Sequence, residues 1–193
     1  MPPRITRGFS DEERTEIAAL YWQAFGAKLG KVMGPDQKAL EFLKRNVDPQ
    51  YALVARDGHG TIMGDAGYKT AQGAFVGGDM RALAEVYGWL SMLWRAPMLA
   101  LVERELEKNV LLMDGICVAY GARGQWIGTA LLNAVKNHAK RTGCNSVRLD
   151  VIDTNSRARA LYEREGFRAT EVQRLGPLSL IFGFSKATQM VWR

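Results

Sequence analysis

Residues 111–143 constrain the fold of this chain more than any other stretch. The stretch opens with LLMDGICVA, a nearly continuous apolar run with β-branched members, which predicts a strand buried on both faces. A short loop follows, and a helical pattern then runs to Gly143. The apolar face of that helix is formed by Ile127, Ala130, Leu131, Ala134, Val135 and His138. A buried strand that leads through a loop into an amphipathic helix predicts an α/β protein built on a mixed sheet.

The other segments supply the remaining elements of this sheet and its helices. Ser10 and Glu13 have the spacing of a capping box, which predicts the start of a helix. In chain order we expect a strand at 5–10, a helix at 11–29, a helix after Pro35, strands at 51–58 and 61–69, a strand at 146–153, a helix at 155–165 capped by Asn155 and stopped by Gly166, and strands around 167–174 and 178–192.

With 193 residues the chain is expected to form a single domain, 1–193, that carries a helical insertion at about 71–110, before the fourth strand. We expect two helices within 79–108, broken at Pro97. Trp89, Met92, Trp94 and Met98 are too many large apolar groups to leave in water. The insertion is therefore predicted to fold back as a lid over an acceptor or to form a homodimer contact.

Composition narrows the function classes. The net charge is +6, yet no basic run with interleaved aromatics predicts nucleic-acid binding, so a small phosphorylated ligand explains the excess equally well. Cys117 and Cys144 have no CxxC or His-rich partner, which argues against a metal site. The apolar window 82–102 carries charges and a proline, and the N-terminus has no secretory apolar region. We expect a cytoplasmic protein without a membrane span.

The loop between the central strand and its helix predicts an anion site. Free N–H groups at a helix N-terminus, together with the helix dipole, attract phosphate, and glycines let phosphate oxygens approach the main chain. The run Ala122-Arg123-Gly124-Gln125-Trp126-Ile127-Gly128 has this character. The bulky Trp126 fits such a site if its ring points outward and only its backbone faces the ligand.

Two motifs resemble those of the GNAT superfamily of acyl-CoA-dependent N-acyltransferases. The first is Arg/Gln-x-x-Gly-x-Gly/Ala, with Arg123 first and Gly128 last; Trp126 stands where the family usually has its first glycine. The second is Asn155-x-x-Ala158-x-x-Leu161-Tyr162-x-x-x-Gly166-Phe167. Together they cover residues 111–168 well.

The resemblance implies a GNAT-like fold whose central sheet is splayed at the fourth strand. The main chain of Ile116, Cys117 and Val118 would then pair with the pantetheine arm of acetyl-CoA, the default acyl donor. The pyrophosphate would bind to the N–H groups of Gly124, Gln125, Trp126, Ile127, Gly128 and Thr129, with Arg123 adding charge. Candidates for further contacts are Asn155, and, for the 3′-phosphate, Lys136, Arg157 and Arg159.

The reaction that the resemblance implies is direct attack of a primary amine on the thioester. Tyr162 is the expected acid for the leaving thiolate, because a phenol stays protonated at neutral pH. Asp150 and Asp114 are the candidate bases. The sequence leaves two alternatives open: a catalytically degenerate module that binds CoA as a sensor, and thioester hydrolysis at Cys117. It does not identify the acceptor.

Overall fold

An eight-stranded mixed sheet organises the chain in the computed structural model, which describes residues 3–100 and 106–193. The strands are β1 (Arg4–Arg7), β2 (Ala52–Arg56), β3 (Ile62–Thr70), β4 (Gly73–Ala74), β5 (Val110–Val118), β6 (Ser146–Ile152), β7 (Arg168–Arg174) and β8 (Lys186–Trp192). Their order is β1-β2-β3-β5-β6-β8-β7, and the short β4 pairs with β3. The pair β5 and β6 is parallel, whereas the other pairs are antiparallel. The predicted mixed α/β sheet is thus confirmed, and the predicted fourth strand is β5.

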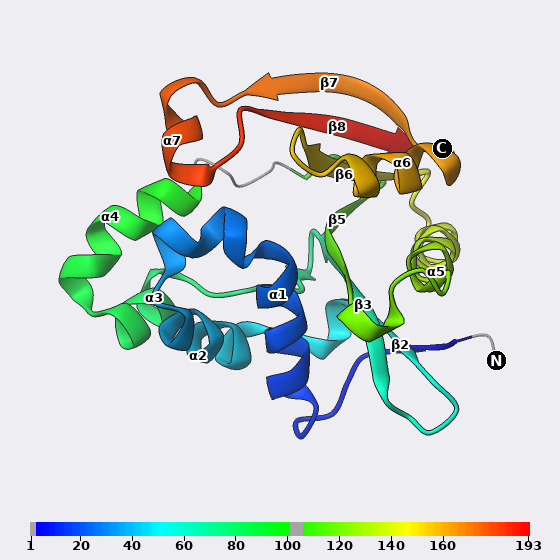
Figure 1. Ribbon diagram of the computed structural model, residues 1–193, viewed down its shortest axis with the longest axis horizontal. Helices are drawn as coiled ribbons and strands as arrows, with labels where there is room; N and C mark the ends of the chain where they lie inside the picture. Colours follow the sequence, from blue (N-terminus) through cyan, green and yellow to red (C-terminus); the bar gives the residue numbers. More distant parts are fainter. Residues whose placement is uncertain (1–2, 101–105) are drawn as a thin grey trace.

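Helices cover both faces of this sheet (Figure 1). They are α1 (Arg14–Met33), α2 (Asp36–Asn46), α3 (Met80–Tyr87), α4 (Trp89–Ala100), α5 (Ile127–Arg141), α6 (Ser156–Arg164) and α7 (Ser179–Phe182), with 3-10 turns at Pro49–Tyr51, Tyr120–Ala122 and Gly176–Leu178. One core joins α5 to the sheet through Leu131, Leu132 and Val135, which are fully buried. On the opposite face, Ile17 and Leu20 of α1 pack against Val54 and Cys117. None of the described helices is both long and apolar enough to span a bilayer.

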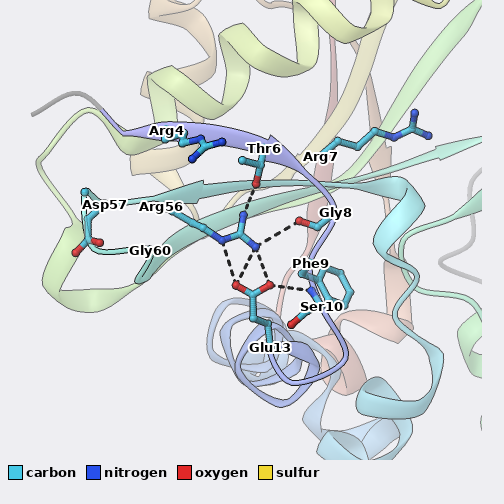
Figure 2. A pocket seen from close by; sticks show the side chains of 11 residues that line it. Arg4, Thr6, Arg7, Gly8, Phe9, Ser10, Glu13, Arg56, Asp57 and Gly60 are labelled. Atoms are coloured by element: carbon cyan, nitrogen blue, oxygen red, sulfur yellow. Dashed lines mark hydrogen bonds and ion pairs between the residues drawn. The ribbon is translucent and has the colours of Figure 1, made fainter.

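The start of α1 is tied to the first two strands. Glu13 accepts a hydrogen bond from the N–H of Ser10 at 2.8 Å and forms an ion pair with Arg56 of β2 at 2.7 Å. This is one half of the predicted capping box; the α-helix itself begins at Arg14, later than predicted, with Glu13 as its N-cap. Arg56 also donates to the hydroxyl of Thr6 in β1 (Figure 2). The Arg56 guanidinium lowers the pKa of Glu13. These contacts fix the position of α1, and the far half of α1 lines the site described below.

The helical insertion differs from the prediction in where it breaks. The two helices meet at Gly88, and Pro97 lies inside α4. Gly88 has a φ of 81°, a backbone conformation that glycine adopts readily and other residues rarely do, so it ends α3. Residues 101–105 of the predicted segment lie outside the described residues.

The large apolar groups of the insertion differ in exposure within the single chain, and its predicted role as a lid or homodimer contact stays a prediction. Met92 is buried, and Met98 packs against the cluster around Phe182. Trp89 and Trp94, by contrast, are 68% and 46% exposed. The inner face of α3 and α4 packs against α1 and α2 through residues that include Leu83, Tyr87 and Met92. The homodimer stays a prediction.

Candidate functional site

The divergence of β5 and β6 opens a cavity of about 100 Å³. The paired positions of the two strands run from Val110 and Ser146 to Leu112 and Arg148, and stop there. Beyond that point the strands form opposite walls of the cavity, which α1 and α6 complete. The three residues predicted to be catalytic, Tyr162, Asp150 and Asp114, all line it.

Tyr162 reaches the cavity from α6. Asn155 caps this helix, as predicted, because its side-chain oxygen accepts a hydrogen bond from the N–H of Ala158 at 3.1 Å. The Tyr162 side chain is buried, and its ring packs against Phe167 with the centroids 5.9 Å apart. The cap and the aromatic contact therefore hold the phenol against the cavity wall.

The two candidate bases come from different walls. Asp150 lies on β6, where it pairs in register with Gln189 of β8. Asp114 lies at a bulge in β5: Gly67 of β3 pairs with Gly115 and Tyr68 with Met113, which leaves Asp114 as the extra residue. The bulge directs Asp114 toward α1, whereas its neighbour Met113 belongs to the core on the α5 face.

The loop before α5 offers main-chain donors. The first main-chain bond of the helix runs from the N–H of Ala130 to the oxygen of Trp126 at 3.0 Å. Within the described parts of the chain, no main-chain carbonyl accepts from the N–H groups of residues 124–129. The hydroxyl of Thr129 is buried and also lacks a hydrogen-bond partner there. These groups suit an anion with several oxygens, because N–H and O–H donors at a helix N-terminus favour negative charge.

Trp126 occupies a left-handed conformation, with φ 63° and ψ 9°. This explains why glycine is usual at this position in the motif, since glycine adopts such a backbone at little cost. The indole is 70% exposed and lies near Arg164, whose guanidinium carbon is 5.6 Å from the ring centroid. The expectation that the ring points outward is confirmed.

Arg123 and Gln125 brace the same loop. The Arg123 guanidinium stacks on Tyr120 at 4.0 Å and donates to the carbonyl of Val118 at 3.3 Å. The Gln125 amide donates to the carbonyl of Gly121 at 2.9 Å. Both side chains therefore have structural contacts, and Arg123 remains exposed at the end of β5.

Cys117 is not among the residues that line the cavity and lies in the core beneath α1. Burial raises the pKa of its thiol well above the usual value, and the neighbouring Asp65 raises it further. Asp65, opposite Cys117 on β3, is fully buried, and burial raises its pKa to about 7. A buried thiol that resists ionisation is a poor nucleophile, so this geometry does not support thioester hydrolysis at Cys117.

A family model described as the acetyltransferase (GNAT) family matches residues 14–167, most of the chain. The chain belongs to this family. Membership supports acetyl transfer as its general chemistry and acetyl-CoA as a cosubstrate. A search of curated proteins found no match.

Solved structures of acetyltransferases share the fold. An N-acetyltransferase from Staphylococcus aureus is 15% identical, with a TM-score of 0.67, covering 98% of this chain and 100% of that one. A GCN5-related N-acetyltransferase from Kribbella flavida is 18% identical, with a TM-score of 0.65 and coverage of 99% and 97%. A putative streptothricin acetyltransferase from Bacillus anthracis, in complex with acetyl coenzyme A, is 18% identical, with a TM-score of 0.50 and coverage of 74% and 61%.

The structure separates the predicted 3′-phosphate candidates of this acetyltransferase. Lys136 forms an ion pair with Glu165 at 3.3 Å, and both side chains are nearly buried. Arg159 pairs with Glu163 at 2.9 Å on the surface of α6, and Arg157 is exposed. The engagement of Lys136 favours the two arginines, since exposed side chains can turn toward a ligand more readily than a buried pair can.

Sequence reasoning missed the contribution of α1 to the site. Phe25 and Lys28 line the cavity between the strands, and Phe25 also packs on Gly115, where an added Cβ would lie 2.1 Å from its ring. A glycine in the middle of the largely apolar run 111–119 was the available signal for such a close approach. Asp65 was also missed, although a carboxylate inside the strand pattern IMGDAGYK marks an unusual position.

Among the described residues, no group of three or more His, Cys, Asp or Glu could hold a metal ion. A surface hollow of about 780 Å³ beside Arg56 and Glu13 (Figure 2) shares no lining residue with the cavity between β5 and β6.

Proposed function

We propose that the chain is an N-acetyltransferase that transfers the acetyl group of acetyl-CoA to a primary amine by direct attack. The observation that carries this proposal is the cavity between the diverging strands. It brings a buried phenol, Tyr162, together with two carboxyl groups, Asp114 and Asp150.

Acetyl-CoA would bind along the splayed edge of β5, at Ile116, Cys117 and Val118, with its pyrophosphate at residues 123–129. The donors of the loop support this placement, because the N–H groups of 124–129 have no main-chain acceptor and the Thr129 hydroxyl is buried without a partner among the described residues. Asn155 lines the same cavity at its α6 end, where a contact with the cosubstrate remains part of the proposal.

When bound, acetyl-CoA supplies a thioester carbonyl: the amine nitrogen forms a bond to its carbon, the carbon–sulfur bond breaks, and CoA leaves as a thiolate. In this proposal Tyr162 donates its proton to the thiolate, and a main-chain N–H near Cys117 stabilises the developing oxyanion. The amine must also lose a proton. Asp114 is the preferred acceptor over Asp150, because it lines both this cavity and the larger one that adjoins it.

The test is Tyr162→Phe, assayed by CoA release with a panel of amines and peptide N-termini. A general acid contributes about 10²- to 10⁴-fold to rate, so turnover should fall by that factor while acetyl-CoA affinity changes little. Tyr51→Phe, which removes a hydroxyl in the 3-10 turn before β2, is the matched control and should retain activity. Unchanged turnover in Tyr162→Phe would contradict the acid role. If the protein binds acetyl-CoA but releases CoA with none of these acceptors, the result would support the sensor alternative instead.

A further inference from the structure

A second, larger cavity adjoins the site. It measures about 710 Å³ and lies among α1, α2, α3, α4 and the segment that follows β4. Phe25, Lys28 and Asp114 line both this cavity and the one between β5 and β6. The two spaces therefore meet at the β5 bulge, on the side of the cavity that faces α1.

The walls of the larger cavity are mostly apolar. Side chains from four helices contribute, among them Leu29, Met33, Phe42, Leu83 and Leu99. Its charged lining residues among those described are Lys28, Lys69, Asp79 and Asp114, two of each sign. A volume of this size suits a small-molecule ligand, since such pockets measure about 300–1,000 Å³.

We infer that the acceptor is a small amine carried on an apolar body, which occupies this cavity with its nitrogen directed at Asp114. This inference rests on the proposed function and names the substrate class for it. The helical insertion supplies the part of the wall that would contact the apolar part of the amine. The residues are Leu83 from α3 and Ala96, Pro97, Leu99 and Ala100 from α4.

The apolar walls act against hydrophilic acceptors. A polyamine or an amino sugar would bring further ammonium or hydroxyl groups against side chains that cannot bond to them. Each such buried group left without a partner lowers affinity by about five- to 150-fold.

The walls also act against an extended peptide. Peptides that bind by strand addition need an exposed sheet edge, and here β3 is already paired on both sides, with β2 and β5. The lining residues lie largely on helices, whose main-chain groups are used within the helix. A compact amine does not need main-chain hydrogen-bond partners of this kind.

The experiment measures CoA release from acetyl-CoA with a series of n-alkylamines and arylalkylamines of increasing length, beside spermidine and a peptide N-terminus. Burial of each added methylene should raise kcat/KM by about fourfold until the cavity is filled. Flat dependence on length, or a higher kcat/KM for spermidine or the peptide than for every apolar amine, would overturn the inference.

Two variants place the effect in this cavity. Ala96→Phe fills it from α4 and should abolish the gain in kcat/KM from the longer bodies. Leu99→Ala enlarges it and should shift the optimum to a longer body. The matched control is Leu90→Phe, which adds a ring to the same helix at a position that is 86% exposed. Cooperative thermal unfolding of each variant checks that it is folded.

Direct binding keeps the inference testable if no amine is acetylated. Calorimetric titration of the same amines into the protein saturated with acetyl-CoA should show affinity that rises with apolar length, falls in Ala96→Phe and persists in Leu90→Phe. That pattern without turnover would refute the proposed transfer but uphold the pocket. Turnover that Ala96→Phe and Leu99→Ala leave unchanged would uphold the transfer and refute the pocket.

Discussion

The two faces of the sheet are built in different ways. On the α5 face, one continuous core fills the space between helix and sheet, and the proposed cosubstrate contacts come from main-chain groups at the N-terminus of the helix. On the α1 face, the apolar residues form separate clusters around a cavity of about 710 Å³, and a carboxyl group, Asp65, is buried beneath α1. If the proposed function is correct, the filled face binds the cosubstrate through main-chain groups, and the open face selects the acceptor through the volume that its side chains leave free.

The largest expected effect is on the α1 face, at Asp65. Its pKa is raised to about 7, so the native state holds a proton that the unfolded state loses above its ordinary value near 4. The stabilising contribution is complete below that ordinary value and is lost as pH rises through 7. The side chain in Asp65→Asn cannot ionise, so this variant should not show the loss. Above pH 7 its free energy of unfolding should exceed that of the wild-type protein by up to about 4 kcal/mol, minus the free-energy cost of burying the amide.

Urea unfolding from pH 4 to 9 measures this effect. Because the neighbouring Cys117 thiol lowers the pKa of Asp65, Cys117→Ala is a second probe: it should raise that pKa and extend the loss of stability to higher pH. An identical pH dependence in Asp65→Asn and the wild-type protein would show that this buried carboxyl does not govern stability.

The next effect concerns the proposed cosubstrate site at the start of α5. A Cβ at Gly128 would lie 2.9 Å from the side chain of Leu161, the neighbour of Tyr162, and a carboxylate there would also repel phosphate. Gly128→Glu should weaken acetyl-CoA binding at least tenfold, roughly 1.4 kcal/mol or more, as followed by calorimetry. Gly128→Ala carries the bulk without the charge and separates the two causes. Equal affinity in all three proteins would remove the phosphate-loop assignment.

A smaller effect is expected from replacing Trp126, because the proposed cosubstrate contacts at this position come from main-chain groups. The left-handed backbone costs a non-glycine residue about 1–2 kcal/mol, and part of this gain is offset because glycine loses more conformational entropy on folding. Trp126→Gly should therefore raise the free energy of unfolding by at most about 1 kcal/mol. Acetyl-CoA affinity should stay the same because the N–H donors remain. A large loss of affinity would mean that the indole itself contacts the cosubstrate.

The smallest effect concerns His138 on the α5 face. Its ring packs against Tyr68 with the centroids 4.8 Å apart, and burial lowers its pKa, with Arg7 and Arg141 acting in the same direction. The native state therefore favours the neutral ring, and its contribution is present above the ordinary value and lost as pH falls below it. In an Asp65→Asn background, stability should decrease slightly from pH 7 to 5, and His138→Phe should flatten that decrease. A slope that His138→Phe leaves unchanged would assign it to other groups.

Local signals account for the predictions that succeeded. The spacing of apolar residues predicted α5, the Asn155 side chain predicted the start of α6, and Gly143 and Gly166 lie where those helices end. Each depends on groups within a few residues of one another, which is the range over which helix periodicity and capping act.

Two predictions failed because longer-range contacts decided the outcome. Pro97 was expected to break the insertion, yet it lies within α4. Arg95 of the same helix donates hydrogen bonds to main-chain carbonyls at the end of α1. The strand expected at 178–192 begins only at Lys186, since α7 packs its Phe182 with Val32 of α1. Lys136, one of three candidates for the 3′-phosphate, pairs with Glu165, a contact that its sequence position did not reveal, and its contact with the phosphate stays a prediction.

The sequence by itself determined the mixed α/β class, the strand–loop–helix that presents main-chain donors, and the two motifs that identify the family, because these depend on short spacings along the chain. Only the tertiary structure decided that Phe25, Lys28 and Asp114 meet where two cavities join. Residues from α1 and β5 are far apart in the chain, and the bulge that turns Asp114 toward α1 depends on the register between β3 and β5. Such a register follows from packing across the whole sheet, which no local pattern encodes.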